Sequence, residues 1–442
     1  MLVNFRFENF LSYNKLTHFS MTIGTTRRHQ THVMKFPDVS LLKFASLYGA
    51  NASGKSNLVK AIKFSRSLIL EGVQKTITFD KYCKMDPGNK EKNTRFEYEI
   101  MIENTVYAYG FAVNLFEKKI YGEWLYSLKN NKEVEIFTRV VNDDENIFNI
   151  NYNELKLNNN DVIRLQIYTE DSKNVSNSLF ITELNNNKQA LTSVNGLSIF
   201  NLIFQWFNEK LEVISPNEST SESGITYLRK DNGLELANFL DAFGTGVKEI
   251  HHKIISEKDL YKELPAPLVK NIIEDIITED TDFSLALLRT PHNIHEIERI
   301  NKDIVIKTVT FKHASDGAYY SLGEESDGTV RLVEIYDILA SNNEKIFVVD
   351  EIDRSLHPNL TYNFIKEYLK KKIPGQLIVT THEDRLLDLE MLRRDEIWFV
   401  EKQDEGDSNL YSLEKYKERF DKDILKAYLD GRYGSIPEFK FF

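Results

Sequence analysis

Residues 41–62 read LLKFASLYGANASGKSNLVKAI, and this stretch decides the fold. Residues 41–48 are apolar enough for a buried strand, and the residues after 56 repeat apolar side chains at helical spacing. Between them, Gly49-Ala-Asn-Ala-Ser-Gly54-Lys55-Ser56 fits the pattern G-x-x-x-x-G-K-[ST]. Glycines let such a loop curl until its backbone N–H groups converge on phosphate oxygens, and the following helix adds the positive end of its dipole. The stretch predicts a nucleotide site on an α/β sheet.

The residues of this loop have distinct expected roles around a triphosphate. Lys55 should reach the β- and γ-phosphates, and the Ser56 hydroxyl should ligate Mg²⁺. Gly49 and Gly54 should form the phosphate cradle, and we place the next residue, Asn57, among the nucleotide-binding residues. The competing interpretation, a glycine-rich turn with an incidental lysine, fits the flanking strand and helix poorly. We therefore expect ATP and Mg²⁺ as cofactors.

The totals of the 442-residue chain exclude several other classes of protein. Its single cysteine, Cys83, rules out a disulfide framework and a cysteine-based metal site. It has no apolar run of membrane-spanning length, and its first residues alternate like a strand rather than a secretion signal, so we expect a cytoplasmic protein with no membrane partner. A net charge of −11 argues against a surface that is basic throughout and clamps DNA. The short basic strip 370–372 is better explained as the solvated end of a helix.

A second motif supplies the carboxylates that a phosphate loop lacks. Residues 346–351 read IFVVDE, which predicts a fully buried strand ending in Asp350 and Glu351. In an open α/β sheet, ligands bind at the carboxyl ends of the strands. We expect Asp350 to hold Mg²⁺ and Glu351 to polarise the attacking water. The alternative is a buried strand that merely ends in acidic residues.

A third motif follows after one predicted helix, at about 359–372. The next apolar run, QLIVTTH, ends at His382, and a strand–helix–strand order of this kind gives parallel neighbours. Asp350 and His382 should therefore lie at the same edge of the sheet, where a histidine can donate a hydrogen bond to a γ-phosphate. A lone histidine is more often structural, and its register with the acidic pair favours function.

A predicted helix at residues 325–339, ESDGTVRLVEIYDIL, begins with a further anion-binding pattern. Ser326 is typical of a helix N-cap, and Leu332, Ile335 and Leu339 form one buried stripe. A serine and a glycine at the positive end of a helix suit an anion. On its own, the pattern would describe an ordinary capped helix.

The remaining chain divides into three predicted parts. Residues 1–170 should form an N-terminal lobe, with paired strands at 1–23 and several more at 95–170. Residues 171–300 should form a mostly helical insertion, and 301–442 a C-terminal lobe that returns to strand at 303–311. The predicted fold class is α/β, a mixed sheet core with a β-rich arm.

The ordered set GANASGKS, ESDGT, VVDE, SLH and TTH resembles the ATP-binding-cassette head of the SMC, RecF and Rad50 group. The resemblance implies an ABC-type ATPase head in which Asn51 helps to place the γ-phosphate and the water. It also implies that Ser355, Leu356 and His357 are the D-loop. The chain is closer still to bacterial ATPases of the abortive-infection type, the AbiL/RloA-like proteins. That similarity runs through NFRFENFLSY, YGANASGKSNL, EESDGT, DEIDRSLHP and AYLDGRYGSIP, and is loose over residues 70–300.

The resemblance also implies a mechanism. In cassette heads the signature end caps the nucleotide held by a second subunit, which predicts a head-to-tail homodimer, or a higher even-numbered oligomer. Lys55, Ser56, Asp350, Glu351 and His382 would come from one chain, and Ser326 and Gly328 from the other. Two residues depart from the pattern: Asp327 stands where many cassettes have Gly, and Glu325 where they have Leu. We identify neither a Q-loop glutamine nor an aromatic platform for adenine.

Four functions compete on this basis. The first is an ATP-hydrolysing switch that controls a separate effector protein, for example a nuclease, in anti-phage defence. The second is a RecF-like DNA repair or recombination ATPase, which would make nucleic acid a partner. The third, a nuclease with a fused toprim domain, is disfavoured because only residues 383–442 follow His382. The fourth, a transporter subunit, is disfavoured because its phosphate loop and signature would lie much closer in sequence. The turn 431–434 near the end is either a docking element or a turn packed on the sheet edge.

Overall fold

The computed structural model of the chain describes residues 1–129, 132–142, 145–155, 157–186, 198–216, 233–278, 283–290, 292–300, 303–314, 317–372, 374–416, 419 and 423–434. They group into two compact units. The first comprises Met1–Val213, Asn342–Ile352 and Leu369–Phe442, and the second comprises Ile214–Ser341 and Asp353–Tyr368. Each unit is thus assembled from separate stretches of the chain.

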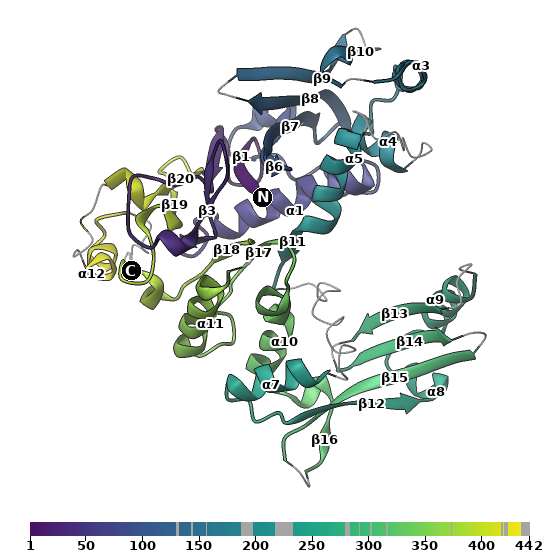
Figure 1. The fold of residues 1–442 in the computed structure, drawn as a ribbon, viewed down its shortest axis with the longest axis vertical. Helices are drawn as coiled ribbons and strands as arrows, with labels where there is room; N and C mark the ends of the chain where they lie inside the picture. The colour runs from purple at the N-terminus through teal and green to yellow at the C-terminus, as the bar shows by residue number, and fades with distance from the viewer. Residues whose placement is uncertain are drawn as a thin grey trace. The chain divides into compact units, whose positions relative to one another are not determined.

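The first unit contains a six-stranded mixed sheet that carries the motifs of the phosphate loop and of the acidic strand. Its order is β11-β17-β18-β5-β19-β20 (Figure 1). β17, β18, β5 and β19 run parallel, and β20 is antiparallel to β19. The bounds are β11 (Leu211–Ile214), β17 (Ile346–Val349), β18 (Gln376–Thr380), β5 (Phe44–Tyr48), β19 (Ile397–Lys402) and β20 (Ser408–Ser412). Every residue of β5, β17 and β18 is buried, as expected for parallel strands that are covered on both faces.

A second, antiparallel sheet in the same unit has the order β10-β9-β8-β7-β6-β1-β2. Its bounds are β10 (Glu145–Ile150), β9 (Lys132–Asn142), β8 (Lys119–Lys129), β7 (Thr105–Asn114), β6 (Thr94–Ile102), β1 (Leu2–Glu8) and β2 (Thr17–Ser20). β3 (Val33–Lys35) and β4 (Ser40–Leu42) form a small separate pair. The predicted strand pairing at 1–23 is confirmed, and so are strands in the predicted range 95–170 as far as Ile150. The rest of that range was wrongly predicted as strand and forms two helices, Tyr152–Leu155 and Asn159–Asp171.

Helix α1 (Lys55–Glu71) shares one apolar core with both sheets. Its Leu58 and Ile62 belong to the same buried cluster as Phe5 and Phe96 of the antiparallel sheet and Val348 of β17. The helix begins at the end of the phosphate loop, so this core fixes the direction in which that loop points. The remaining helices of this region are α2 (Tyr152–Leu155), α3 (Asn159–Asp171), α4 (Phe180–Asn186) and α5 (Ser198–Gln205), with a π-turn at Trp206–Lys210 and a short α12 (Ile424–Leu429). Helix α4 lies beside α1 (Figure 1).

The second unit has its own sheet and core. The sheet has the order β12-β15-β14-β13, with β16 pairing β15. The helices α8 and α9 share one buried cluster with the sheet, formed by Leu260, Val269 and Ile276 of the helices and Ile297 and Ile306 of the strands. The bounds are β12 (Glu249–Ile255), β13 (Phe283–Arg289), β14 (Ile294–Ile300), β15 (Asp303–Lys312), β16 (Tyr319–Tyr320), α8 (Glu257–Leu260) and α9 (Ala266–Thr278).

Three further helices complete this unit. Helix α7 (Leu234–Ala242) packs on α10 (Asp327–Ala340) through Phe239 and Tyr336, whose ring centroids are 4.9 Å apart. Phe243, just after α7, contacts Phe364 of α11 (Pro358–Lys370) at 6.1 Å. Of the apolar stripe predicted for the signature helix, Leu332 and Ile335 are buried and Leu339 is half-buried. The start of the helix is exposed at Ser326 and Asp327.

The α/β fold class is confirmed, and the sheet of the second unit is an addition to it. We expected residues 171–300 to be mostly helical, and the described part contains β11 to β14 as well as helices. The segment FSLALLR of β13 is a short apolar run, which periodicity alone cannot assign to strand or helix. The predicted strand at 303–311 is confirmed as β15.

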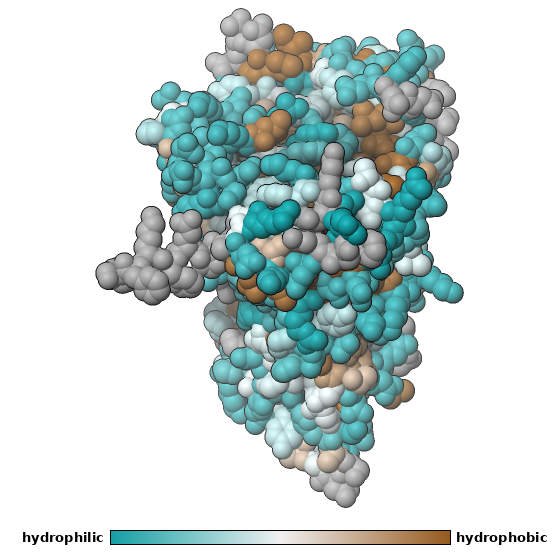
Figure 2. Space-filling model, turned by 90° about the vertical axis from the view of Figure 1, so that its left-hand side faces the viewer, coloured by the Kyte–Doolittle hydropathy of each residue, from teal (hydrophilic) through white to brown (hydrophobic). Residues whose placement is uncertain are grey.

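The lengths and the hydropathy of the helices bear on the prediction about membranes. Within the described ranges, no helix is both long enough and apolar enough to cross a membrane. The face drawn in Figure 2 is mostly hydrophilic, with scattered hydrophobic patches.

The turn 431–434 packs against the six-stranded sheet: Tyr433 is fully buried, and its ring stacks on Phe399 with the ring centroids 5.4 Å apart. This packing favours the structural interpretation of that turn over a docking element.

Candidate functional site

The phosphate loop follows the central strand β5 and ends where α1 begins, and both of its motif glycines are required by space. A Cβ on Gly49 would lie 2.3 Å from the Val400 carbonyl oxygen, and one on Gly54 would lie 2.2 Å from the Ser408 hydroxyl. Gly54 also has φ +117°, a conformation that L side chains rarely adopt. The hairpin of β19 and β20 thus packs closely against the loop, and only glycine fits at these two positions.

Lys55 spans the mouth of this loop. Its ammonium donates to the carbonyl oxygens of Gly49 at 2.6 Å and Ala50 at 3.2 Å, and its side chain is buried. A buried cation costs free energy unless polar groups stabilise it, and here two loop carbonyl oxygens accept its hydrogen bonds. The ammonium is therefore held where the phosphates of a nucleotide in this loop would lie.

Ser56 and Asp350 come from opposite ends of the sequence and meet at the edge of the sheet. The Ser56 hydroxyl donates to Asp350 Oδ1 at 3.1 Å, and the Thr380 hydroxyl donates to the same oxygen at 2.6 Å. A serine hydroxyl beside a carboxylate is an all-oxygen donor pair, which suits Mg²⁺ with water and phosphate oxygens completing its shell. These two residues fit the predicted metal site.

Glu351 has an unusual backbone. It has φ +52°, in the left-handed region, and its N–H donates to the Thr380 hydroxyl at 2.8 Å. Non-glycine residues in this region are uncommon, and they gather at active sites where surrounding contacts hold them. Thr380 thus sets both the carboxylate of Asp350 and the backbone of Glu351.

His382 lies at the same edge. β17 and β18 are parallel neighbours with Val349 opposite Val379, so the residues after both strands emerge side by side. His382 is exposed there, two residues beyond Thr380. The structure therefore brings together Lys55, Ser56, Asp350, Glu351 and His382 in the first unit, and their roles in catalysis stay predictions.

The two asparagines differ in their surroundings. Asn51 is exposed on the loop, as a contact to the γ-phosphate requires. The Asn57 amide donates to the Ser12 hydroxyl at 2.9 Å, so in this structure it supports the loop from the N-terminal segment.

Several supporting residues were not predicted. The Ser408 hydroxyl contacts the Ser53 carbonyl oxygen at 2.5 Å and the Ser12 hydroxyl at 2.8 Å. Tyr13 donates to the Gly54 carbonyl oxygen at 3.1 Å, and burial raises the pKa of its phenol, which keeps it a donor. Single Ser and Tyr residues in loops or at a strand end form no pattern, so no motif in the sequence pointed to Ser12, Tyr13 or Ser408.

The signature residues belong to the second unit. Ser326 is the N-cap of α10, as predicted, and its hydroxyl accepts from the Thr329 N–H at 3.2 Å. A Cβ on Gly328 would lie 3.0 Å from the carbonyl oxygen of Ser355, which itself has φ +60°. The start of the signature helix and the predicted D-loop are therefore in direct contact.

The two departures from the cassette pattern have different environments. Glu325 is turned into the unit, where its carboxylate lies 2.7 Å from His313 Nε2 and is almost fully buried. Asp327, the first residue of α10, is exposed. Of the two carboxylates, only that of Asp327 faces outward at this helix end.

Comparisons with known proteins give one family match. A family model described as "AAA domain, putative AbiEii toxin, Type IV TA system" matches residues 44–388, from the start of β5 to just beyond His382. No curated protein matches the sequence.

Among solved structures, an SMC head bound to the C-terminal winged-helix domain of ScpA is 14% identical, with a TM-score of 0.42, and the match covers 94% of this chain and 99% of that one. The SMC head domain of Thermotoga maritima is 13% identical, with a TM-score of 0.35 and coverage of 93% and 98%. An SMC head with an extended coiled coil, bound to a ScpA domain from Pyrococcus furiosus, is 14% identical, with a TM-score of 0.32 and coverage of 98% and 99%.

Proposed function

The chain belongs to the AAA-domain family described by the putative AbiEii toxin of type IV toxin–antitoxin systems, and on that premise we propose that it is a switch driven by ATP binding and hydrolysis. The observation that carries the proposal is the meeting of Ser56, Asp350 and Thr380 at the carboxyl edge of the sheet, beside the phosphate loop. The likeness to AbiL/RloA-like proteins within abortive infection remains a finer prediction than this family match.

The proposed reaction converts ATP and water to ADP and phosphate. Lys55 and the loop N–H groups hold the phosphates, while Ser56 and Asp350 hold Mg²⁺, which supplies charge neutralisation on the phosphate oxygens when bound. Glu351 accepts a hydrogen bond from the attacking water and orients it. His382 donates to the γ-phosphate from the neighbouring strand end.

We further propose that two copies associate head to tail with ATP between them. The N-terminal end of α10 combines a helix dipole with Ser326 and Gly328, a combination that favours an anion. In this structure the Ser326 hydroxyl is engaged as the N-cap, so its contact with a phosphate would replace or share the bond to Thr329. ATP would favour the closed pair and hydrolysis the open one, which makes the nucleotide a switch between two states.

The proposed output is control of a separate effector in defence against phage. The family description names a toxin of a toxin–antitoxin system, which supports a role in growth arrest or infection. The alternative, a DNA repair ATPase, predicts binding of DNA by the chain alone, with an affinity that falls steeply with salt. Titration of the purified chain with a fluorescent duplex at two salt concentrations separates the two functions.

The first experiment is light scattering of Glu351→Gln with and without ATP and Mg²⁺. The substitution keeps the left-handed backbone position and removes the charge that polarises water, so ATP should bind and persist. We expect ATP to convert monomer to dimer, and Ser326→Arg to prevent it. Glu351→Gln with Lys55→Ala is the matched control, because it should stay monomeric with ATP. An unchanged mass in all variants would overturn the dimer and leave a nucleotide-binding chain without this switch.

A further inference from the structure

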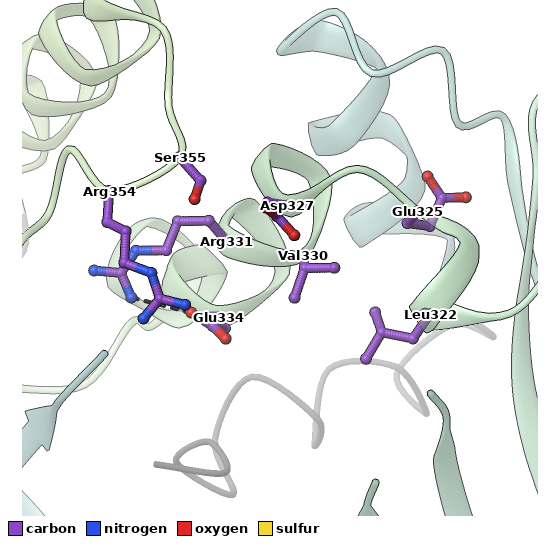
Figure 3. Close-up of a pocket in the computed structure, with 9 residues that line it drawn as sticks. Leu322, Glu325, Asp327, Val330, Arg331, Glu334, Arg354 and Ser355 are labelled. Carbon is purple, nitrogen blue, oxygen red and sulfur yellow. Dashed lines mark hydrogen bonds and ion pairs between the residues drawn. The ribbon is translucent and has the colours of Figure 1, made fainter. Parts of the chain in front are cut away.

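A pocket of about 240 Å³ lies at the start of α10, entirely within the second unit (Figure 3). Its walls come from the 3-10 turn Leu322–Glu324, the first turns of α10 and the predicted D-loop. The charged and polar residues that line it are Glu325, Asp327, Arg331, Glu334, Arg354 and Ser355. The pocket therefore joins the signature and the D-loop in one surface.

Most of these charges are already paired. Arg331 Nη1 lies 3.0 Å from Glu334 Oε2, and the Arg331 side chain is only 2% exposed. Burial lowers the pKa of Arg331, Glu334 opposes that effect and the nearby Arg354 adds to it. Glu325 is paired with His313 at 2.7 Å. The charges that face outward are those of Asp327 and Arg354, and both residues are exposed.

Figure 3 shows how these two side chains lie. Arg354 extends beside Arg331, and Asp327 projects from the helix start on the other side of Arg331. The Nη1 amino group of the Arg354 guanidinium also donates to the Pro216 carbonyl oxygen, so in this structure one of its amino groups is engaged within the unit. The guanidinium is a permanent, planar cation whose fork of donors matches phosphate oxygens.

The carboxylate of Asp327 creates a difficulty for the composite site. It stands on the first residue of the helix whose end would face a triphosphate, and like charges at contact distance repel. A cation on the same surface removes the difficulty, since it offsets the carboxylate and attracts the phosphates. Arg354 is the exposed cation that lines this pocket with Asp327.

We propose that Arg354 contacts the phosphates of ATP held by a second copy of the chain, and that it offsets Asp327 at that site. The inference rests on the head-to-tail dimer proposed above. It assigns the pocket a ligand class, the triphosphate end of a nucleotide, and it assigns Arg354, the residue before the predicted D-loop, a charged contact made across the dimer.

The first test measures the ATP-dependent dimer in the Glu351→Gln background by light scattering over a range of protein concentrations. Loss of one charge-assisted contact should weaken the dimer roughly 10- to 100-fold in Arg354→Ala. Arg354→Lys should lose less, because it keeps the charge without the fork. Arg164→Ala, which removes an exposed arginine of α3, is the matched control and should leave the dimer unchanged.

The second test removes the charge that Arg354 offsets. Asp327→Gly added to Arg354→Ala should restore most of the lost affinity, and Asp327→Gly alone should match or exceed the parent. If Arg354→Ala weakens the dimer and Asp327→Gly restores nothing, the compensation is wrong. Retained thermal unfolding temperatures in all variants keep folding defects out of the comparison.

The third test asks whether the contact is made across the dimer. Lys55→Ala and Arg354→Ala, each otherwise native and each impaired alone, are mixed, and ATP hydrolysis is measured. A mixed dimer has one site with an intact phosphate loop and an intact Arg354 from the other chain, so the mixture should exceed the sum of its parts. If the mixture hydrolyses ATP no faster than the sum of its parts while Glu351→Gln still dimerises with ATP, the role of Arg354 is overturned and the proposed dimer stands. Absence of that dimer overturns the proposed function instead.

Discussion

The phosphate loop of the first unit and the signature end of the second are two halves of one predicted site, and they are built in opposite ways. The loop is held on every side: two glycines are enclosed by neighbouring atoms, Lys55 is bonded to loop carbonyls, and three hydroxyls support it from β20 and the N-terminal segment. The signature end exposes Ser326 and Asp327 at a helix start, beside an open pocket. In the proposed head-to-tail dimer, the first half would be formed before a nucleotide binds, and the second would be completed by the bound nucleotide.

The strongest way to break this comparison is to remove the charge at the centre of the preformed half. Lys55→Ala deletes charge-assisted bonds to two phosphates, so ATP affinity should fall roughly 100-fold or more. A fluorescent ATP analogue measures it directly. Lys60→Ala, an exposed lysine on the same helix, should bind as the parent does. Equal loss in both variants would mean that the effect is general electrostatics and not a site.

The same substitution, glycine to alanine, at Gly54 in the phosphate loop and at Gly328 in the signature helix sharpens the comparison. Gly54→Ala places a Cβ 2.2 Å from the Ser408 hydroxyl at φ +117°, and should reduce ATP affinity by roughly 10-fold or more in the monomer. In Gly328→Ala the nearest atom to the added Cβ is the Ser355 carbonyl oxygen at 3.0 Å, and the backbone is not strained, so the variant should keep monomer binding intact while weakening the ATP-dependent dimer. Nucleotide titration and light scattering read the two effects. A loss of monomer binding in Gly328→Ala would contradict the division of the site.

Thr380 tests whether the preformed half is organised for turnover as well as for binding. Thr380→Val keeps the shape and removes both hydrogen bonds, so kcat should fall roughly 10- to 100-fold and the Mg²⁺ requirement should rise, with little change in ATP affinity. Thr380→Ser should recover most of the rate because the hydroxyl is retained. If serine fails to rescue, the threonine acts through packing alone.

The smallest expected effect concerns the open half. Ser326→Ala removes the N-cap of α10, which should cost about 1 kcal/mol of stability. Ser326→Asn should restore the cap. Both variants should bind ATP as monomers with the parent affinity, measured by the same fluorescent analogue. A loss of ATP affinity in either monomer would mean that the signature end takes part in nucleotide binding within one chain, which would contradict the division of the site into two halves.

The sequence predicts the two regions unequally. The loop, the acidic strand end and His382 lie on elements whose apolar runs are unambiguous, so their convergence at one sheet edge follows from βαβ topology. Thr380, Ser12 and Ser408 lie in motifs or loops where a hydroxyl has no periodic signature, and they meet only through long-range contacts. In the sheet of the second unit, β15 was predicted, and β12, β13 and β14 were missed because periods of two and of 3.6 residues are hard to separate in segments of seven residues.

The course of the backbone between Glu351 and Ser355 has a mechanical consequence. The chain leaves the first unit at Ile352 and enters the second at Asp353. One residue with a left-handed backbone stands on each side of this crossing, Glu351 before it and Ser355 after it. In the proposed switch, a rotation of the peptide at Glu351 would reach the predicted D-loop through the backbone of the three residues between Glu351 and Ser355. One glycine inserted at the crossing would lengthen this covalent path, and an unchanged ATP-dependent dimer in that variant would show that the path does not carry the signal.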